Sequence, residues 1–110
     1  MEAEESKVKV EYGIDTTFVT FNADKILEEQ QINELDDSIM PVIGKNKDGK
    51  LILNFSNVQF MSSSLLGLLV KVHKRVCEMG GHLQLINVNP NIYKVFQITH
   101  LTKVFDIAKS

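Results

Sequence analysis

The sequence predicts one α/β domain, with a single mixed β-sheet of about four strands, an N-terminal hairpin and three to four flanking helices. Two observations predict it: strand-like and helix-like segments alternate after the hairpin, and residues 50–55 form a nearly continuous apolar strand. The chain has 110 residues, 44% hydrophobic and 24% charged, which is typical of one folded domain. We assign the domain to residues 7–110 and expect the acidic residues 1–6 to fray.

The N-terminal part is predicted to be a β-hairpin. In residues 7–12 every second side chain is apolar, at Val8, Val10 and Tyr12, as in a half-buried strand. Residues 13–15 are predicted to form a short turn. Residues 16–22 are rich in Thr, Phe and Val, which favours a second strand.

The first helix is expected from residue 30 onward. Its apolar side chains recur at helical spacing, at Ile32, Leu35, Ile39 and Val42. Pro41 lies late in the segment, where we expect it to kink or end the helix. A polar loop at residues 44–50 precedes the apolar strand, whose composition predicts that both faces of the sheet are covered.

A long amphipathic helix is predicted to follow residue 62 and to end at Gly80–Gly81. Its inward side chains are expected to be Leu65, Leu66, Leu69, Val72, Val76 and Met79. Residues 82–88 favour the next strand. Asn89 then caps a third helix that Pro90 begins, with Ile92, Val95 and Phe96 inward. Residues 104–107 are predicted to be a short strand or a helical tail.

Three loops are expected at the functional edge of the sheet. In α/β sheets this edge lies beyond the carboxyl ends of the parallel strands. The loops are residues 22–29, residues 62–64 and residues 89–90.

The chain shows no pattern typical of an enzyme, and we expect no catalytic residue, cofactor or metal. His73 and Cys77 lie four apart on one predicted helix, but a zinc site needs about four donors and no others have suitable spacing. Cys77 is therefore expected in the core and His73 at the flank of the helix. The pair Asp36–Asp37 is interpreted as a solvated helix face.

Composition bounds the partners and the compartment. A formal charge of −2 provides no general attraction for nucleic acid or acidic lipid. A single cysteine excludes an internal disulfide and favours a reducing cytoplasm. No apolar run approaches the roughly 20 residues that span a bilayer. We expect a cytoplasmic protein with no nucleic-acid or membrane partner.

The consecutive serines Ser62, Ser63 and Ser64 are the main functional signal. They open the long helix, where backbone N–H groups are unpaired and the helix dipole is positive, so they could cap the helix, hold an anion or carry a phosphate. The simplest interpretation is that Ser62 or Ser63 caps the helix, which is worth about 1 kcal/mol. No capping box is formed, because Leu65 or Leu66 would occupy the third helical position. One cap needs one serine, which leaves hydroxyls available for another role.

These residues resemble the STAS domain (sulphate transporter and anti-sigma factor antagonist), and within it the small bacterial anti-sigma factor antagonists. The likeness rests on FMSSSLLGLL, the Gly80–Gly81 turn, the strand HLQLINVNP and the pattern VFxxTxL near the C-terminus. It covers residues 7–107 and is specific for residues 51–101. The resemblance implies a STAS fold and a role in transcription regulation.

Carried over onto this sequence, the phosphorylated serine of the family falls on Ser63, with Ser64 and Ser62 as alternatives. Two residues depart from the family pattern: Ser62 replaces the motif aspartate, and Leu65 replaces the glycine after the serines. The acidic residue after the second strand corresponds to Asp24 or Glu28. The partner-binding residues implied by the resemblance are Asp24, Ser62, Ser63, Ser64 and Leu65.

The resemblance implies a phosphorylation switch. The unmodified protein binds an anti-sigma factor that is also a serine kinase, phosphorylation of Ser63 ends the binding, and a serine phosphatase restores it. If Leu65 or Leu66 is exposed, it would be the apolar anchor of the contact. We expect a monomer, with a dimer left open.

Two alternatives remain open at this point. One is a STAS scaffold subunit of a signalling or transport complex that is never phosphorylated, which the missing aspartate favours. The other is a small-ligand or nucleotide-binding STAS domain that uses the helix start as an anion site, although the bulk of Leu65 crowds the approach.

Overall fold

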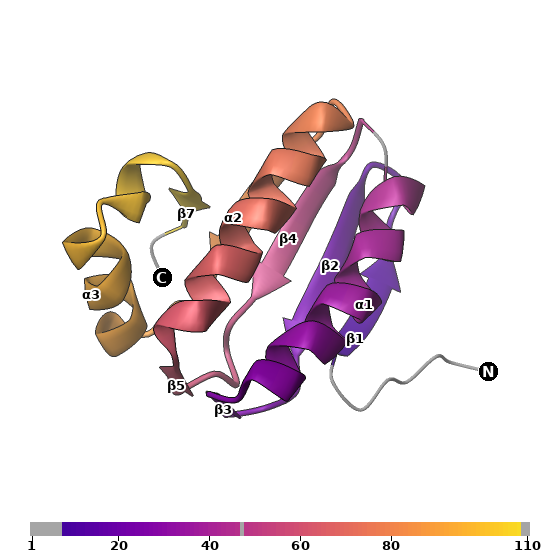
Figure 1. Cartoon of the computed structure of the whole chain (residues 1–110). Helices are drawn as coiled ribbons and strands as arrows, with labels where there is room; N and C mark the ends of the chain where they lie inside the picture. Colours follow the sequence, from indigo (N-terminus) through magenta and orange to yellow (C-terminus); the bar gives the residue numbers. More distant parts are fainter. Residues whose placement is uncertain (1–7, 47, 109–110) are drawn as a thin grey trace.

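The structure, a computed structural model, describes residues 8–46 and 48–108. The expected fraying of residues 1–6 lies outside these residues. The elements follow the order β1, β2, β3, α1, β4, β5, α2, β6, α3, the 3-10 helix η1, and β7 (Figure 1). This alternation of strands and helices after the hairpin confirms the predicted α/β fold.

Five strands form the main sheet, in the order β1-β2-β4-β6-β7. They are β1 (Val8–Tyr12), β2 (Thr16–Phe21), β4 (Lys50–Asn54), β6 (His82–Ile86) and β7 (Asp106–Ile107). β1 pairs antiparallel with β2, so the predicted hairpin is confirmed. The other neighbours pair in parallel, as strands joined by crossovers do. The fifth strand arises from the C-terminal segment for which the sequence predicted either strand or helix.

Two helices, α1 (Glu29–Lys45) and α2 (Ser63–Glu78), lie side by side over one face of the sheet (Figure 1). Alternate strand residues point toward them because side chains on a strand alternate between its two faces. The buried strand residues on this face include Val19, Phe21, Leu51, Leu53, Leu83 and Leu85. The inward residues predicted for both helices are buried as well, apart from Met79, which is partly buried.

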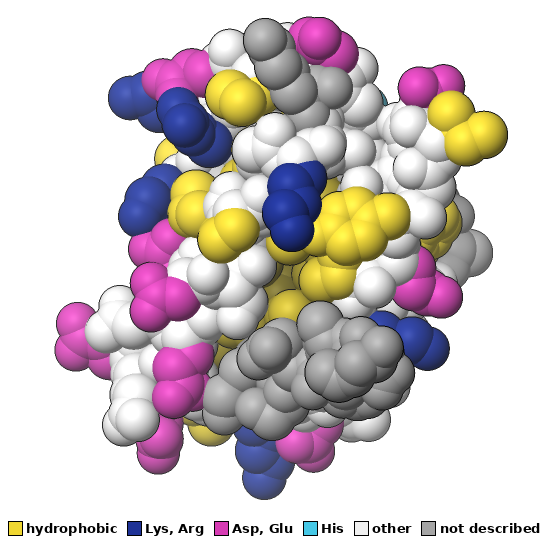
Figure 2. Space-filling model, turned by 90° about the vertical axis from the view of Figure 1, so that its right-hand side faces the viewer, with side chains coloured by type: hydrophobic (Ala, Val, Ile, Leu, Met, Phe, Trp, Pro, Cys, Tyr) yellow, Lys and Arg dark blue, Asp and Glu magenta, His cyan; other side chains and the backbone are white. Residues whose placement is uncertain are grey.

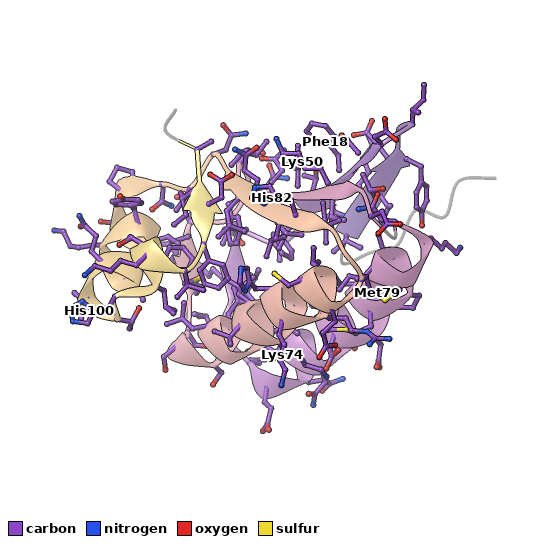
Figure 3. All side chains as sticks on the ribbon, turned by 90° about the horizontal axis from the view of Figure 1, so that it is seen from above. Phe18, Lys50, Lys74, Met79, His82 and His100 are labelled. Carbon is purple, nitrogen blue, oxygen red and sulfur yellow. The ribbon has the colours of Figure 1, made fainter. Side chains whose placement is uncertain are left out.

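The opposite face of the sheet carries polar side chains and is not covered by any described helix. Lys50, Ile52 and Asn54 point to it from β4, and Figure 3 shows Phe18, Lys50 and His82 on the side of the sheet away from α2. The prediction that both faces are covered is therefore wrong for the described part of the chain. Ile52 is nevertheless 7% exposed, because it lies in the middle of the sheet between Phe18 and Gln84 on the neighbouring strands.

Pro41 lies inside α1 and does not end it. The helix continues to Lys45, four residues beyond the proline. The Pro41 side chain is exposed, so its ring displaces no core residue. Of the two expected effects, a kink or an end of the helix, the end does not occur, because a helix anchored by Ile39, Val42 and Ile43 in the core tolerates the loss of one hydrogen bond.

The ends of α2 and α3 (Pro90–Ile98) follow the sequence signals. α2 stops at Glu78, and Gly80 adopts a left-handed φ of 79°, a conformation that favours glycine. The Gly81 N–H then donates to the Val76 carbonyl (2.9 Å). Asn89 caps α3 as predicted, since its Oδ1 accepts from the Ile92 N–H (2.9 Å).

A second, very small sheet lies at the carboxyl edge of the main one. It consists of β3 (Lys25–Ile26) and β5 (Phe60–Met61), paired in parallel. In Figure 1 both strands lie at the end of the molecule where α1 and α2 begin. The C-terminal region adds the 3-10 helix η1 (Leu101–Lys103) before β7. Two-residue strands carry no readable alternation, so the sequence did not predict this sheet.

Candidate functional site

The serine segment, Ser62 to Ser64, directly follows β5 and begins α2. Ser62 occupies the N-cap position with an extended backbone, and its carbonyl accepts from the Leu65 N–H (3.1 Å). The Ser62 N–H donates to the carbonyl of Ile26 (3.0 Å), which joins the start of α2 to β3. The segment is therefore held in place through its main chain.

The Ser62 hydroxyl does not cap the helix. Its Oγ is buried and has no hydrogen-bond partner among the described residues. The interpretation of Ser62 as a side-chain cap is therefore wrong, although the residue does occupy the N-cap position. A buried hydroxyl without a partner is costly, so this serine is not there to stabilise the helix end.

Ser63 and Ser64 are the first two residues of α2, and both are exposed. Their side chains lie in the first turn, where the helix dipole is positive. A negative group attached to either hydroxyl would face solvent and experience a favourable field. The two positions are accessible to an enzyme that modifies hydroxyls.

Leu65 and Leu66 belong to the core. Leu65 is 0% and Leu66 7% exposed. An apolar anchor at these residues required one of them to be exposed, and neither is. The assignment of Leu65 to the partner-binding residues therefore needs correction. Leu65, Leu69, Val72 and Val76 recur at three- and four-residue spacing, which turns all four toward the sheet.

Asp24 lies opposite the residues that precede the serine segment. Its main-chain carbonyl accepts from the N–H groups of Gln59 (2.7 Å) and Phe60 (3.0 Å), and its side chain is exposed. The structure thus brings Asp24, Ser62, Ser63 and Ser64 to one end of the sheet, with Leu65 buried beneath them. The pairing of β3 with β5 places the two loops together.

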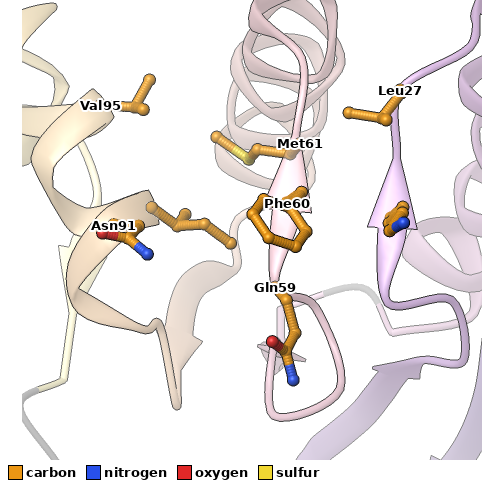
Figure 4. A pocket seen from close by; sticks show the side chains of 8 residues that line it. Leu27, Gln59, Phe60, Met61, Asn91 and Val95 are labelled. Atoms are coloured by element: carbon orange, nitrogen blue, oxygen red, sulfur yellow. The ribbon is translucent and has the colours of Figure 1, made fainter.

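An apolar groove next to the serines was not predicted. Phe60 is 52% and Leu27 49% exposed, and both line the groove together with Val95 of α3 (Figure 4). Sequence reasoning assigns apolar side chains near strands to the core by default. The one available signal was the position of Phe60 two residues before Ser62.

The other candidate residues form isolated pairs. His73 Nε2 lies 3.8 Å from Cys77 Sγ, and both come from α2. Cys77 is exposed, so the expectation that it lies in the core is wrong. Asp36 forms an ion pair with the exposed Lys71 (2.7 Å), as expected of a residue on a solvated helix face. Over the described ranges, no group of three or more His, Cys, Asp or Glu side chains is placed to hold a metal ion.

Charges of both signs are mixed on the surface. On the β1 side of the molecule, acidic and basic side chains are interspersed around apolar ones (Figure 2). There Tyr12 is 56% exposed, and its ring centre lies 5.9 Å from Lys45 Nζ. Within residues 8–46 and 48–108, every helix is too short or too polar to cross a bilayer.

The model of the STAS domain family matches residues 7–110. The chain belongs to the STAS domain family. This confirms the resemblance found in the sequence, and the fold comparison agrees. A STAS domain protein from Planctomyces limnophilus superposes with a TM-score of 0.85 at 23% identity, covering 94% of this chain and 91% of that one.

Two curated STAS relatives are anti-sigma factor antagonists. The anti-sigma F factor antagonist of Paenibacillus polymyxa is 32% identical over 57 residues, 52% of this chain and 49% of that protein. The anti-sigma-B factor antagonist of Bacillus subtilis is 31% identical over 74 residues, 67% of this chain and 66% of that protein. The chain thus matches between about half and two thirds of the length of these relatives.

The STAS fold of this chain is also that of SpoIIAA. Its unphosphorylated form superposes with a TM-score of 0.68 at 21% identity, covering 94% of this chain and 88% of that one. The phosphorylated form gives the same TM-score and identity and covers 94% and 92%. At this identity the likeness concerns the fold.

Proposed function

We propose that this STAS domain is an anti-sigma factor antagonist: a non-enzymatic module that sequesters an anti-sigma factor with serine-kinase activity and is released when Ser63 is phosphorylated. The observation that carries the proposal is the exposed residue Ser63 at the first position of α2, at the same end of the sheet as the exposed residue Asp24. The names of the curated relatives and the existence of SpoIIAA in a phosphorylated form support it.

Phosphorylation at Ser63 would act on the contact and leave the fold intact. A phosphate in the first turn of a helix meets a positive dipole end, so it is tolerated or mildly stabilising. Leu65, two residues later, is fully buried and holds the turn onto the core. The phosphate would oppose docking, because burying an unpaired charge in an interface costs several kcal/mol.

Substituting Ser63 by Asp tests this separation of binding from stability. We expect Ser63→Asp to shift the melting temperature by only a few degrees, because the carboxylate also suits the helix start. Binding of the kinase should fall about a thousandfold, which corresponds to roughly 4 kcal/mol. Calorimetric melting and titration of the purified partner measure the two effects, with Ser63→Ala as the uncharged control. A Ser63→Asp protein that unfolds would refute the proposed mechanism.

The modified residue can be identified directly. The protein is incubated with ATP and each purified anti-sigma factor of the serine-kinase class from the same genome, and the phosphate is located by mass spectrometry. Phosphate on Ser63 is the expected result. Phosphate only on Ser62 or Ser64 would show that the residue assignment is wrong.

The second candidate is a STAS scaffold subunit that is never phosphorylated. The specific observation in its favour is at Ser62, where the family has an aspartate and this chain has a buried hydroxyl with no hydrogen-bond partner in the described part of the structure. A carboxylate beside the phosphorylated serine is therefore missing. If the kinases bind the protein and leave it unmodified, the scaffold function is supported.

A further inference from the structure

The groove beside the serine segment is lined mainly by apolar side chains. It encloses about 450 Å³ between β5, α3 and the segment around β3. Figure 4 shows Phe60 between Leu27 on one side and Val95 on the other. Val95 is half-buried, and Ile98, one helical turn further along α3, is 72% exposed and extends the apolar surface.

The walls of the groove are fixed by hydrogen bonds that do not involve its apolar side chains. Asn89 caps α3 and also donates from Nδ2 to the carbonyl of Val58 (3.0 Å), which ties α3 to the segment before β5. The Gln31 amide accepts from the N–H groups of Leu27 and Glu28 (2.9 Å each) and fixes the segment after β3. The groove is therefore preformed, which lowers the entropic cost of binding.

Its polar groups define the chemistry of the occupant. Lys25 is the only charged residue among the described residues that line the groove, and its Nζ lies 6.0 Å from the centre of the Phe60 ring. Gln59 and Asn91 add two amides. Asp24 and Glu28 lie outside the lining. An apolar group with a carboxylate at its Lys25 end satisfies this arrangement.

We infer that this groove receives a bulky apolar side chain of the docking protein, flanked by a carboxylate that pairs with Lys25. The inference rests on the proposed function and extends its interface. Phe60 lies three residues before Ser63 on one continuous segment, so the groove and the phosphorylation site belong to the same surface. The groove thereby provides the apolar anchor that the sequence analysis expected at Leu65 or Leu66.

Variants of Phe60 and Lys25 test the inference against the anti-sigma factor kinase that binds the wild-type chain. We expect Phe60→Ser to weaken the affinity at least about 30-fold, as loss of a central apolar anchor does. Lys25→Glu should weaken it about tenfold and reduce the salt dependence of the association rate. The matched controls are Ile14→Ser, 98% exposed on the β1–β2 turn, and Lys74→Glu on the exposed side of α2.

The control variants should bind like the wild-type protein, and all four variants should keep the wild-type circular dichroism spectrum. If the kinase binds Phe60→Ser and Lys25→Glu as tightly as the wild-type chain, the inference is overturned while the proposed function stands. If none of the kinases binds the wild-type chain, the proposed function fails, and a second measurement then decides about the groove.

That measurement uses small probes in place of the partner. The 15N-labelled protein is titrated with 4-phenylbutyrate and, separately, with 4-phenylbutylamine, which has the opposite charge. Amide shifts at Phe60, Met61 and Val95 with the carboxylate, weaker with the amine and absent in Phe60→Ser, support the groove chemistry. Equal shifts with both probes, or no shifts at these residues, contradict it.

Discussion

At the scale of single residues, Ser62 and Asn89 occupy the same position at the start of two helices but make different contacts. Asn89 accepts from the Ile92 N–H and donates to Val58, so both ends of its amide are used. The Ser62 hydroxyl is buried and makes no such contact with residues 8–46 or 48–108. The two residues therefore differ in their expected contribution to stability.

Alanine substitutions measure this difference. We expect Asn89→Ala to lower the free energy of unfolding by about 1–2 kcal/mol, because a cap and a link to the segment before β5 are lost. Ser62→Ala should change it by less than about 0.5 kcal/mol or raise it slightly, since no hydrogen bond is broken and a buried polar group is removed. Urea unfolding of both variants checks this. A loss of about 1 kcal/mol in Ser62→Ala would show that the hydroxyl does cap the helix.

Predictions for single residues succeeded where a strong local preference determines the position of the residue. Asn89 and Pro90 have strong positional preferences at a helix start, and they lie where expected. The position of Cys77 depended on the rotation of α2 against the sheet. Its neighbours at helical spacing allow more than one rotation, so Cys77 was wrongly expected inside. Leu65 was correctly expected inside from its spacing, and its place in the contact surface came only from the resemblance.

At the scale of elements, β7 is held to the sheet partly by side chains at its outer edge. His82 Nε2 on β6 lies 2.7 Å from Asp106 Oδ2, and Gln84 Nε2 lies 3.4 Å from the same oxygen. The hydrogen bond from His82 is the main reason why the pKa of Asp106 lies below its usual value of 3.8. Both partners are largely exposed, so the contribution to stability is small.

The lowered pKa of Asp106 predicts a change in stability with acidity. A carboxyl whose pKa is lower in the folded state stabilises the fold above its unfolded pKa, and this stabilisation is lost as the pH falls through the folded pKa. We expect Asp106→Asn to be less stable than the wild-type protein near pH 6, with the difference shrinking below about pH 4. Urea unfolding at both pH values measures it. A difference that grows on acidification would contradict the assignment.

Long elements were predictable and short ones were not. Strand β4 and helices α1 and α2 contain enough residues for their apolar periods to be read. Strands β3 and β5 have two residues each, and their pairing depends on main-chain hydrogen bonds that leave no pattern in the sequence. The groove was missed for the same reason, because it exists only where these two strands meet α3.

At the scale of the whole molecule, the core extends under the serine segment. Leu65 and Leu69 belong to the same buried cluster as Leu53 and Leu85 of the central strands. The start of α2 is thus fixed to the main sheet by packing and to β3 by its main chain. Under the proposed function, this packing is why phosphorylation of Ser63 would leave the fold intact.

Truncating Leu65 tests how much of the stability depends on this packing. We expect Leu65→Ala to lower the free energy of unfolding by about 2–5 kcal/mol, because it creates a cavity at a fully buried site. Val70→Ala on the same helix, at a residue that is 42% exposed, should change it by less than about 0.5 kcal/mol. Denaturant unfolding compares the two variants. Similar losses of unfolding free energy in both variants would mean that helix propensity, and not packing of Leu65, causes the effect.

The bond between Asp24 and Gln59 and the bond between Ser62 and Ile26 are made by backbone atoms alone. Such bonds place no demand on the identity of the side chains beside them. The exposed residues on β3 and β5, Lys25 and Phe60, can therefore change through evolution while the backbone arrangement that displays them persists. A duplicated gene could acquire a new binding preference through a few substitutions of exposed residues on these two strands, while the core that stabilises the domain stays unchanged.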